Sequence, residues 1–298
     1  MEDTMIQWEQ ELLSKHTTFR IGGAAAWYLV PEKPEEVAEA VAFAGEKNLP
    51  FYILGRGSNM LFADEGYEGV IIEVGKGMEE VRIEENGTVT AQAGIPLSTL
   101  AVKLAEAELA GFEFAGGIPG TLGGAIAMNA GAYGGEIKDC IVSAKILTEK
   151  GEIITLSKEE LELGYRTSII QKKPYIVLEG TFSFEKGNRQ TILDTMKDLN
   201  NRRREKQPLE FPSAGSTFKR PEGYFAGKLI EDAGLKGYRV GDAQVSEKHC
   251  GFVINRGKAT AEDVKQLIAD VQCRVREKFQ VNLEPEVRVV GSKGEKLK

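Results

Sequence analysis

The 298-residue chain has few of the residues that build metal centres or disulfide frameworks. It has two histidines, His16 and His249, and no HExxH or other ligand spacing. Its three cysteines, Cys140, Cys250 and Cys273, form no CxxC pair and are odd in number. A His/Cys metal centre is therefore not expected, and the thiols indicate scattered reduced cysteines in a reducing compartment.

Long apolar runs and an excess of basic charge are also missing. Gly or charged residues interrupt every apolar stretch well before the roughly 18 residues of a membrane span. The start, Met1–Thr4, lacks the basic-then-apolar pattern of a signal peptide. Lys and Arg number 38 against 45 Asp and Glu, a net charge of −7, which argues against a protein that coats nucleic acid. We expect a cytoplasmic protein with no nucleic-acid partner, no membrane span and no metal site.

Glycine is abundant: it makes up 34 of the 298 residues, about 11%, whereas its usual share is about 7%. One cluster, Gly55-Arg56-Gly57-Ser58-Asn59, follows a predicted strand. It is not the dinucleotide fingerprint GxGxxG, because Met60 stands at the sixth position, and the chain has no Walker A motif. Two glycines allow backbone N–H groups to converge on an anion, although a tight turn between strands explains the same residues equally well.

The second cluster, residues 116–125, reads GGIPGTLGGA, and six of its ten residues are Gly or Ala. The segment 116–135 is too rich in glycine for an expected helix. Small residues allow the backbone to approach a flat or extended ligand closely, at an entropic cost that close packing alone would rarely require. The two clusters together favour a cofactor cleft, with a diphosphate-containing ligand lying across both loops.

Hydrophobic periodicity and turn signals predict a mixed α+β or α/β chain with a domain boundary near residue 200. Helices are expected at 34–48, 96–110, 191–206, 224–233 and 260–279, the last opening with Thr260 and Asp263 at capping-box spacing. Strands are expected at 50–54, 69–74, 251–255 and 286–290, and hairpins at 81–93 and 141–156.

Seven short motifs occur in order within residues 17–290. They are TFRIGG at 18–23, LGRGSN at 54–59, IPGTLGG at 118–124, NAGAYG at 129–134, GYRTS at 164–168, AGSTFK at 214–219 and LEPEVR at 283–288. Each alone is weak, but in this order they resemble the UDP-N-acetylenolpyruvoylglucosamine reductase (MurB) family. The resemblance is to the shorter type, because the interval between Arg166 and Ser216 holds only Tyr175 and lacks the tyrosine-bearing loop of longer members.

The resemblance implies an α+β fold: an FAD-binding fold of the vanillyl-alcohol-oxidase (PCMH) type in two lobes, with a C-terminal α/β substrate-binding domain. The expected division is 1–75, 76–200 and 201–298, with a C-terminal strand that returns to the active site. It also implies a reaction, in which non-covalent FAD and NADPH reduce a small-molecule substrate, UDP-N-acetylglucosamine enolpyruvate, to UDP-N-acetylmuramate for peptidoglycan. A monomer or weak homo-oligomer is expected.

The chemistry of this reduction suggests roles for three residues that match family positions. Hydride addition to the enol ether leaves enolate-like negative charge. A planar guanidinium that binds the substrate carboxylate can stabilise this charge. The resemblance gives this role to Arg166. Ser216 matches the proton donor, and Glu286 matches the third catalytic position. On residue type alone, Arg166 is typical of a surface or salt-bridged arginine, and Ser216 of a turn residue.

Further residues are expected to bind cofactor or substrate. Cofactor-binding residues are Arg20, Gly55, Arg56, Gly57, Ser58, Asn59, Gly117, Ile118, Pro119, Gly120, Gly123, Gly124, Asn129, Gly131, Ala132 and Tyr133. Substrate-binding residues are Lys206, Lys219, Arg220, Lys228, Lys236 and His249. Lys206 resembles the family's diphosphate lysine, although its run of basic residues is also typical of a solvated helix end.

Two other functions fit part of this pattern. An oxidase or dehydrogenase of the same fold, acting on a sugar or hydroxyacid, would share the glycine loops but would not need Arg166, Ser216 and Glu286 together. A non-catalytic flavin or nucleotide carrier would have no use for the region after residue 200.

Overall fold

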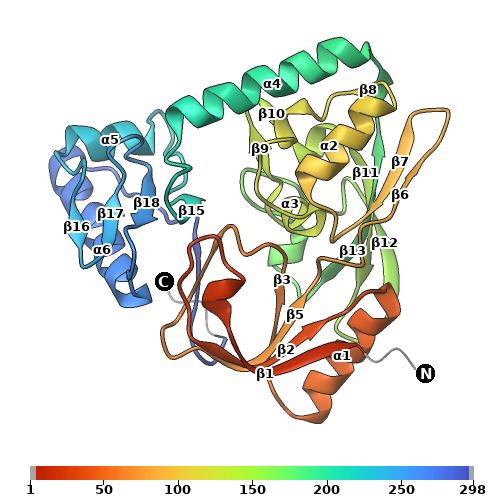
Figure 1. The fold of residues 1–298 in the computed structure, drawn as a ribbon, viewed down its shortest axis with the longest axis horizontal. Helices are drawn as coiled ribbons and strands as arrows, with labels where there is room; N and C mark the ends of the chain where they lie inside the picture. The colour runs from red at the N-terminus through yellow and green to blue at the C-terminus, as the bar shows by residue number, and fades with distance from the viewer. Residues whose placement is uncertain (1–4, 295–298) are drawn as a thin grey trace. The chain divides into compact units, whose positions relative to one another are not determined.

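The structure is a computed structural model that describes residues 5–294. The chain forms two compact units (Figure 1). Unit 1 comprises the residues up to Trp8 with Tyr28–Arg56 and Ile71–Arg203, and unit 2 comprises Glu9–Trp27, Gly57–Val70 and the residues from Arg204 on. Two N-terminal segments thus belong to the same unit as the C-terminal third. The division into 1–75, 76–200 and 201–298 stays a prediction.

A five-stranded antiparallel sheet forms the centre of unit 1, in the order β12-β11-β13-β7-β6. Its strands are β6 (Val81–Ile83), β7 (Thr88–Gln92), β11 (Ile141–Leu147), β12 (Ile153–Ser157) and β13 (Ile176–Ser183). Both predicted hairpins, β6–β7 and β11–β12, are confirmed. The first turns at Asn86-Gly87, where Gly87 has φ 84° and the Thr88 N–H donates to Asn86 Oδ1 over 2.9 Å.

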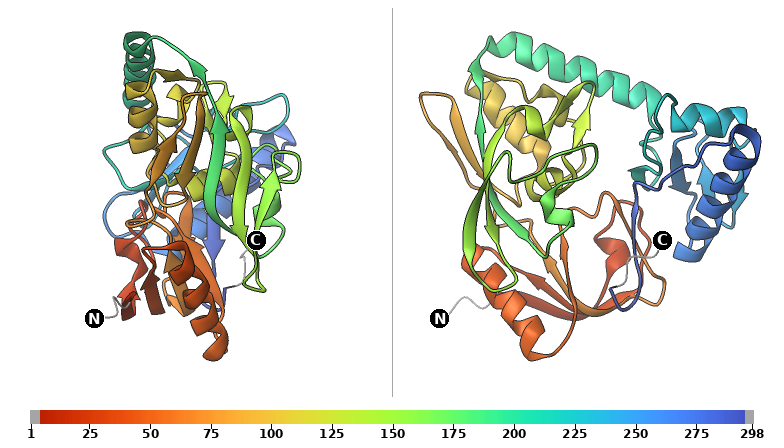
Figure 2. Two further views of the ribbon diagram at one scale, coloured as in Figure 1. Left: turned by 90° about the vertical axis from the view of Figure 1, so that its right-hand side faces the viewer. Right: turned by 180° about the vertical axis from the view of Figure 1, so that it is seen from behind.

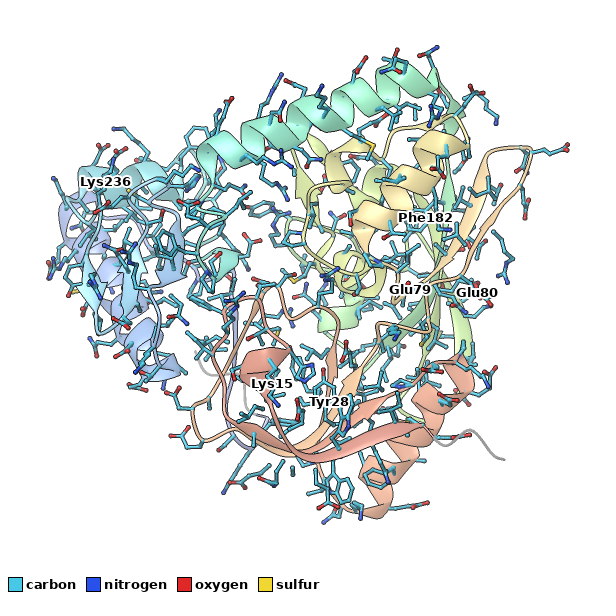
Figure 3. All side chains as sticks on the ribbon, viewed as in Figure 1. Lys15, Tyr28, Glu79, Glu80, Phe182 and Lys236 are labelled. Carbon is cyan, nitrogen blue, oxygen red and sulfur yellow. The ribbon has the colours of Figure 1, made fainter. Side chains whose placement is uncertain are left out.

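The described part of unit 1 also contains four α-helices, although the last of them runs three residues into unit 2. They are α1 (Pro34–Glu46), α2 (Leu97–Glu106), α3 (Leu122–Met128) and α4 (Arg189–Lys206). Helices α2 and α4 lie on one side of the sheet (Figure 2). There Leu100 and Leu104 of α2 share a core with Ile192 and Met196 of α4 and with Phe182 of β13, which Figure 3 labels.

The predicted helix 96–110 is too long. Helix α2 ends at Glu106, and Glu108 takes a left-handed conformation with φ 57°. Leu109–Ala110 instead form a short strand, β8, that pairs with β14 (Glu185–Lys186). The buried Leu109 side chain and this pairing outweigh the helical periodicity at the end of the segment.

The expectation that 116–135 contains no helix is wrong, because α3 lies within it. Gly123 and Gly124 occupy the first turn of α3, where the Leu122 and Gly123 N–H groups donate to the carbonyls of Ile95 and Ala93. A Cβ on Gly123 would lie 3.0 Å from that of Ala93, so glycine permits the close approach. Helix α3 packs on β13, and Leu122, Ala125 and Ile126 are buried. This burial offsets the entropic cost of the glycines.

Unit 2 contains an antiparallel sheet of order β15-β18-β17-β16. Its strands are β15 (Ser213–Ser216), β16 (Arg239–Val240), β17 (Ala243–Val245) and β18 (Phe252–Asn255), and its helices are α5 (Ala226–Asp232) and α6 (Ala261–Phe279). Helix α6 packs against α5, β16 and β17, with Val264, Leu267 and Val271 in the core. A parallel pair, β4 (Met60–Phe62) and β19 (Arg288–Val290), belongs to the same unit.

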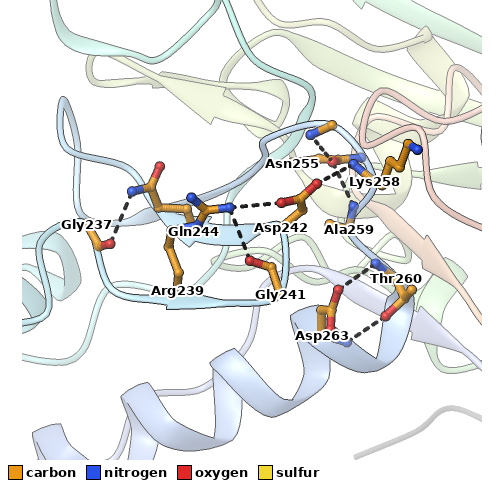
Figure 4. A network of polar contacts seen from close by, with 11 residues as sticks. Gly237, Arg239, Gly241, Asp242, Gln244, Asn255, Lys258, Ala259, Thr260 and Asp263 are labelled. Atoms are coloured by element: carbon orange, nitrogen blue, oxygen red, sulfur yellow. Dashed lines mark hydrogen bonds and ion pairs between the residues drawn. The ribbon is translucent and has the colours of Figure 1, made fainter.

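The predicted capping box at the start of α6 is confirmed (Figure 4). The Asp263 N–H donates to Thr260 Oγ1 and the Thr260 N–H donates to Asp263 Oδ2, both over 3.0 Å. In the preceding turn, Asn255 Oδ1 accepts from the N–H groups of Gly257 and Ala259. These bonds satisfy backbone donors where the chain passes from β18 into α6.

The remaining strands are short or pass from one unit to the other. A four-stranded sheet has the order β1-β2-β5-β3. Its strands are β1 (Ile6–Leu12), β2 (Ala24–Val30), β3 (Phe51–Leu54) and β5 (Tyr67–Glu73). A separate antiparallel pair consists of β9 (Gly131–Ala132) and β10 (Gly135–Glu136).

Within residues 5–294, no helix is both long and apolar enough to span a bilayer, and no three His, Cys, Asp or Glu side chains form a group that could ligate a metal. All three cysteines are free thiols. Burial raises the pKa of Cys140 to about 12, so this thiol stays protonated at neutral pH.

Candidate functional site

Arg166 occupies a constrained loop in unit 1. Its backbone is left-handed, with φ 55°, and its side chain is half-buried. Its Nη2 donates to the Gly131 carbonyl over 3.1 Å, and the guanidinium lies 5.3 Å from the centre of the Tyr165 ring. Gln171 donates through Nε2 to the Arg166 carbonyl over 3.1 Å. The loop therefore holds both the backbone and the side chain of Arg166.

Asn129 joins this loop to the glycine-rich segment that follows α3. The Asn129 side chain is fully buried. Its Nδ2 donates to Gly164 O over 3.0 Å and to Glu136 Oε2 over 2.7 Å, and its Oδ1 accepts from the Lys138 N–H over 2.9 Å. These bonds occupy both amide hydrogens. Asn129 thus positions the loop that presents the Gly131 carbonyl, and direct contact with a cofactor stays a prediction.

Ser216 and Glu286 lie on neighbouring segments of unit 2, and both are half-buried. Ser216 ends β15, next to Gly215 with φ 76°. The Glu286 N–H donates to Thr217 O over 2.8 Å. Further along, Phe218 pairs with Pro285 in antiparallel fashion, so the segment from 216 runs beside the segment that ends at 286. Residues 70 positions apart in sequence therefore come together.

The loop after β3 contributes to the same part of unit 2. Asn59 donates through Nδ2 to Glu286 O over 3.0 Å, and its own carbonyl accepts from the Arg288 N–H over 2.9 Å. Gly57 has φ 59°, and a Cβ there would lie 2.2 Å from His16 O. Both residues therefore support the chain's own packing, and Asn59 fixes the backbone of Glu286.

Close packing within unit 1 explains more of the glycines than the sequence argument allowed. A Cβ on Gly55 or Gly117 would lie 2.4 Å from a side-chain oxygen, of Thr121 and of Asn200 respectively. A Cβ on Gly131 would lie 2.7 Å from the Glu136 Cβ. The premise that packing would rarely need so many glycines is thus wrong. Gly124 differs, because it is exposed and its nearest neighbour would be 3.7 Å away.

Arg203 is a functional candidate that the sequence analysis did not single out. It lies on α4, is 9% exposed, and burial lowers its pKa. The Tyr133 hydroxyl hydrogen-bonds to its guanidinium. Within residues 5–294, Arg203 Nε is the buried side-chain nitrogen or oxygen that lacks a hydrogen-bond partner. Helical periodicity could have found it, because the buried residues of α4 are Ile192, Met196 and Arg203.

The basic residues expected to bind substrate have different surroundings in unit 2. Lys219 pairs with Glu284, and the Arg220 guanidinium lies 3.9 Å from the centre of the Phe225 ring. The exposed Lys228 and Lys236 pair with acidic residues of α5, Asp232 at 2.7 Å and Glu231 at 3.8 Å. Figure 3 labels Lys236 at the surface. Lys206 is exposed at the end of α4. Substrate binding by these residues stays a prediction.

His249, the last residue of that group, is half-buried. Its Nδ1 accepts from the Gly251 N–H over 3.1 Å, and its ring meets Phe252 edge-on at 5.0 Å. Burial lowers the pKa of His249 below its ordinary value of 6.5. The imidazole is therefore neutral at pH 7, which favours packing over a cationic contact with phosphate.

This shift makes stability depend on pH. The unfolded chain takes up the His249 proton at a higher pH than the folded chain does, so the free energy of unfolding falls as pH drops below about 6.5. His249→Gln removes this contribution and should give a shallower fall. Urea unfolding of both proteins between pH 8 and pH 5 checks this, and parallel curves would contradict it.

The residues in unit 1 fit a flavin nucleotide. Such a ligand presents diphosphate and ring-carbonyl oxygens, which need N–H donors and room for close approach. Gly124 and Gly134 leave that room, since a Cβ on Gly134 would meet nothing within 4 Å. Arg203 supplies an unpaired N–H.

Of the predicted contacts, Arg56 and Tyr133 are exposed, whereas Ile118 and Ala132 are half-buried. Pro119 is exposed and Gly120 half-buried, and in unit 2 Arg20 is exposed and Ser58 half-buried.

Family comparison gives two matches along the chain. A family described as FAD binding domain matches residues 25–157. A second, described as UDP-N-acetylenolpyruvoylglucosamine reductase, C-terminal domain, matches residues 207–290.

Whole-chain relatives carry the same name. A UDP-N-acetylenolpyruvoylglucosamine reductase of Lachnoclostridium phytofermentans is 59% identical over 286 residues, which cover 95% of this chain and 92% of that protein. One of Alkaliphilus oremlandii is 53% identical, covering 94% and 92%. The crystal structure of UDP-N-acetylenolpyruvylglucosamine reductase (MurB) from Thermus caldophilus has a TM-score of 0.82 and 35% identity, covering 96% of this chain and 99% of that one.

Proposed function

The chain belongs to the UDP-N-acetylenolpyruvoylglucosamine reductase family, and from this premise we propose that it reduces UDP-N-acetylglucosamine enolpyruvate to UDP-N-acetylmuramate with electrons from NADPH. The family makes it an FAD-containing oxidoreductase of peptidoglycan synthesis. The expected α+β fold, an FAD-binding fold with a C-terminal domain, is confirmed. The observation that carries the proposal is 59% identity to a reductase of this name over 95% of the chain.

The proposed reaction adds a hydride to the terminal carbon of the enolpyruvyl group and a proton to the carbon that bears the carboxylate. FAD, when bound, supplies the two-electron chemistry between NADPH and the substrate. The protein must then hold the carboxylate, stabilise the charge that develops on it, and deliver a proton to one carbon.

We assign the carboxylate to Arg166. A guanidinium stays charged and matches a carboxylate with two parallel N–H donors. One of its nitrogens already donates to Gly131 O, and Gln171 holds its backbone, so the side chain needs little reorganisation to meet the substrate. The left-handed backbone at Arg166 is a strained conformation of the kind that surrounding structure must maintain.

We assign the proton to Ser216. Its half-buried hydroxyl ends a strand, and the adjacent Gly215 leaves its surroundings open, since a Cβ on Gly215 would meet nothing within 4 Å. A hydroxyl is a weak acid, but the enolate is a strong base, which makes the transfer feasible. Glu286, held beside this strand by the bond to Thr217 O, is the third proposed catalytic group.

We place the substrate's diphosphate with the basic residues at the start of the C-terminal segment. Lys206 is exposed, and Lys219 and Arg220 follow Ser216 closely in sequence. Lys219 pairs with Glu284, two residues before Glu286. Binding of a diphosphate would therefore compete with a carboxylate for the Lys219 ammonium.

The visible spectrum of the purified protein under anaerobic conditions tests the proposal. NADPH should bleach the flavin bands, and UDP-N-acetylglucosamine enolpyruvate should then restore them without oxygen. Restoration by oxygen alone would indicate an oxidase. A protein that takes up no added FAD would overturn the assignment.

A further inference from the structure

Arg166 occupies a backbone position that is unfavourable for arginine. Gly164 and Thr167 close a tight turn, in which the N–H of each donates to the carbonyl of the other over 3.1 and 3.3 Å. Arg166 is the third residue of this turn and has φ 55°. Such a positive φ normally selects Gly or Asn, because an L side chain is strained there. Contacts from outside the turn must therefore maintain this conformation.

The Gln171 side chain supplies such a contact at the Arg166 carbonyl. Gln171 Nε2 donates to Arg166 O over 3.1 Å, to Ala127 O over 2.6 Å and to Met128 Sδ over 3.4 Å. The two carbonyls are the main partners of the two amide hydrogens, since a thioether sulfur is a weak acceptor. The opposite orientation of the amide would place its oxygen against two carbonyl oxygens, so these partners fix the nitrogen here. Gln171 thus bridges the Arg166 turn and Ala127.

Ala127 belongs to the last turn of α3, where backbone carbonyls have no partner within the helix. Its carbonyl also accepts from the hydroxyl of the buried Ser168 over 2.7 Å. Two side chains of the segment that follows Arg166 therefore bind one carbonyl at the end of α3. Asn129, the residue directly after α3, holds the other side of the turn through its bond to Gly164 O. The turn is thus anchored to the end of α3 on both sides of Arg166.

We propose that Gln171 is a positioning residue, whose bridge between Ala127 O and Arg166 O keeps the Arg166 guanidinium in place for the substrate carboxylate. The inference rests on the proposed function for the role of Arg166. Without the bridge, the turn can relax toward an ordinary negative φ, and the guanidinium then moves relative to its partner Gly131 O. Stabilisation of developing charge requires donors that are already in place, so this movement slows the step in which the carboxylate gains charge.

The test compares flavin reduction by NADPH with flavin reoxidation by UDP-N-acetylglucosamine enolpyruvate in variants of Gln171. Gln171→Met has a similar length but no donor, and it should slow reoxidation about tenfold, the effect of losing one hydrogen bond, with flavin reduction unchanged. Gln171→Glu should slow reoxidation further, because a carboxylate would face two carbonyl oxygens. Gln171→Lys, whose ammonium has three donors, should recover part of the rate.

The matched control is Gln190→Met. Gln190 is exposed on α4 and donates to Asp194 Oδ1 over 3.1 Å. Its replacement removes the same amide from the same unit of the chain, and both half-reactions should keep their wild-type rates.

A double-mutant cycle shows whether Gln171 acts through Arg166. In an Arg166→Met background, Gln171→Met should change reoxidation by less than about twofold, because no guanidinium remains to be positioned. A merely structural role predicts the full tenfold loss in both backgrounds. Trypsin provides a readout that needs no substrate: it should cut the Arg166–Thr167 bond several-fold faster in Gln171→Met than in wild type, because the turn opens more often.

The proposal is overturned if folded Gln171→Met is reoxidised at the wild-type rate, if both half-reactions slow alike, or if the losses in the two backgrounds are equal. Should Gln171→Met not fold, Gln171→Asn withdraws the amide by one methylene and should give the same loss, so wild-type reoxidation in that variant also overturns it. A wild-type flavin that the enolpyruvyl substrate does not reoxidise would instead overturn the proposed function. Faster tryptic cleavage in Gln171→Met would then still support the role of Gln171 in the turn, and unchanged cleavage would contradict it.

Discussion

Replacing Ser216 with alanine is expected to lower turnover of UDP-N-acetylglucosamine enolpyruvate by about 10²–10⁴-fold, the usual contribution of a positioned general acid. Reduction of the flavin by NADPH should continue at the wild-type rate, because that half-reaction requires no proton from Ser216. Rapid-mixing absorbance measurements of the two half-reactions separate these effects. The loss should fall on the oxidative half alone.

Two companion variants make this result specific. Ser213→Ala removes a hydroxyl from the same strand β15 and should leave both half-reactions unchanged. Ser216→Cys restores a proton donor of similar size, with an ordinary pKa of about 8.5, and should recover part of the activity. Equal loss of both half-reactions in Ser216→Ala would show that the hydroxyl supports the fold or the flavin and is not the proton donor.

Local signals in the sequence predicted much of the fold because they act over a few residues. The Thr260–Asp263 capping box and the Asn86-Gly87 turn each specify backbone hydrogen bonds within four positions, and both are present. Helix α3 could not be predicted in this way. Its first turn is stable because the carbonyls of Ala93 and Ile95 accept the N–H groups of Gly123 and Leu122, and because β13 covers its apolar side. These partners lie far away in sequence.

The candidate site likewise combines residues that local motifs predict with contacts between residues far apart in sequence. Motif resemblance selected Arg166, Ser216 and Glu286, but no pattern of spacing shows that Asn59 fixes the Glu286 carbonyl across 227 positions. Arg203 was missed for the opposite reason. Its neighbours Arg202 and Arg204 are exposed, so the run as a whole is typical of a solvated helix end, although its buried position follows the periodicity of α4.

Replacing Arg166 with methionine should lower the rate of the oxidative half-reaction by about 10²–10³-fold, as for the loss of one preorganised group that stabilises developing charge. The charge on the substrate carboxylate grows during hydride transfer, so the interaction strengthens in the transition state. The loss should therefore appear in kcat more than in KM. Steady-state kinetics with UDP-N-acetylglucosamine enolpyruvate as the varied substrate provide the measurement.

Lysine at position 166 is expected to restore little of this activity, although it keeps the charge. A single ammonium cannot make two parallel bonds to a carboxylate, and the contact with Gly131 O would compete for it. Lys172→Met is the matched control, because Lys172 is an exposed cation six residues later that pairs with Glu162. Full activity in Arg166→Lys would contradict the bidentate role, since any cation would then suffice. A selective rise in KM in Arg166→Met would show that Arg166 binds substrate and transition state equally.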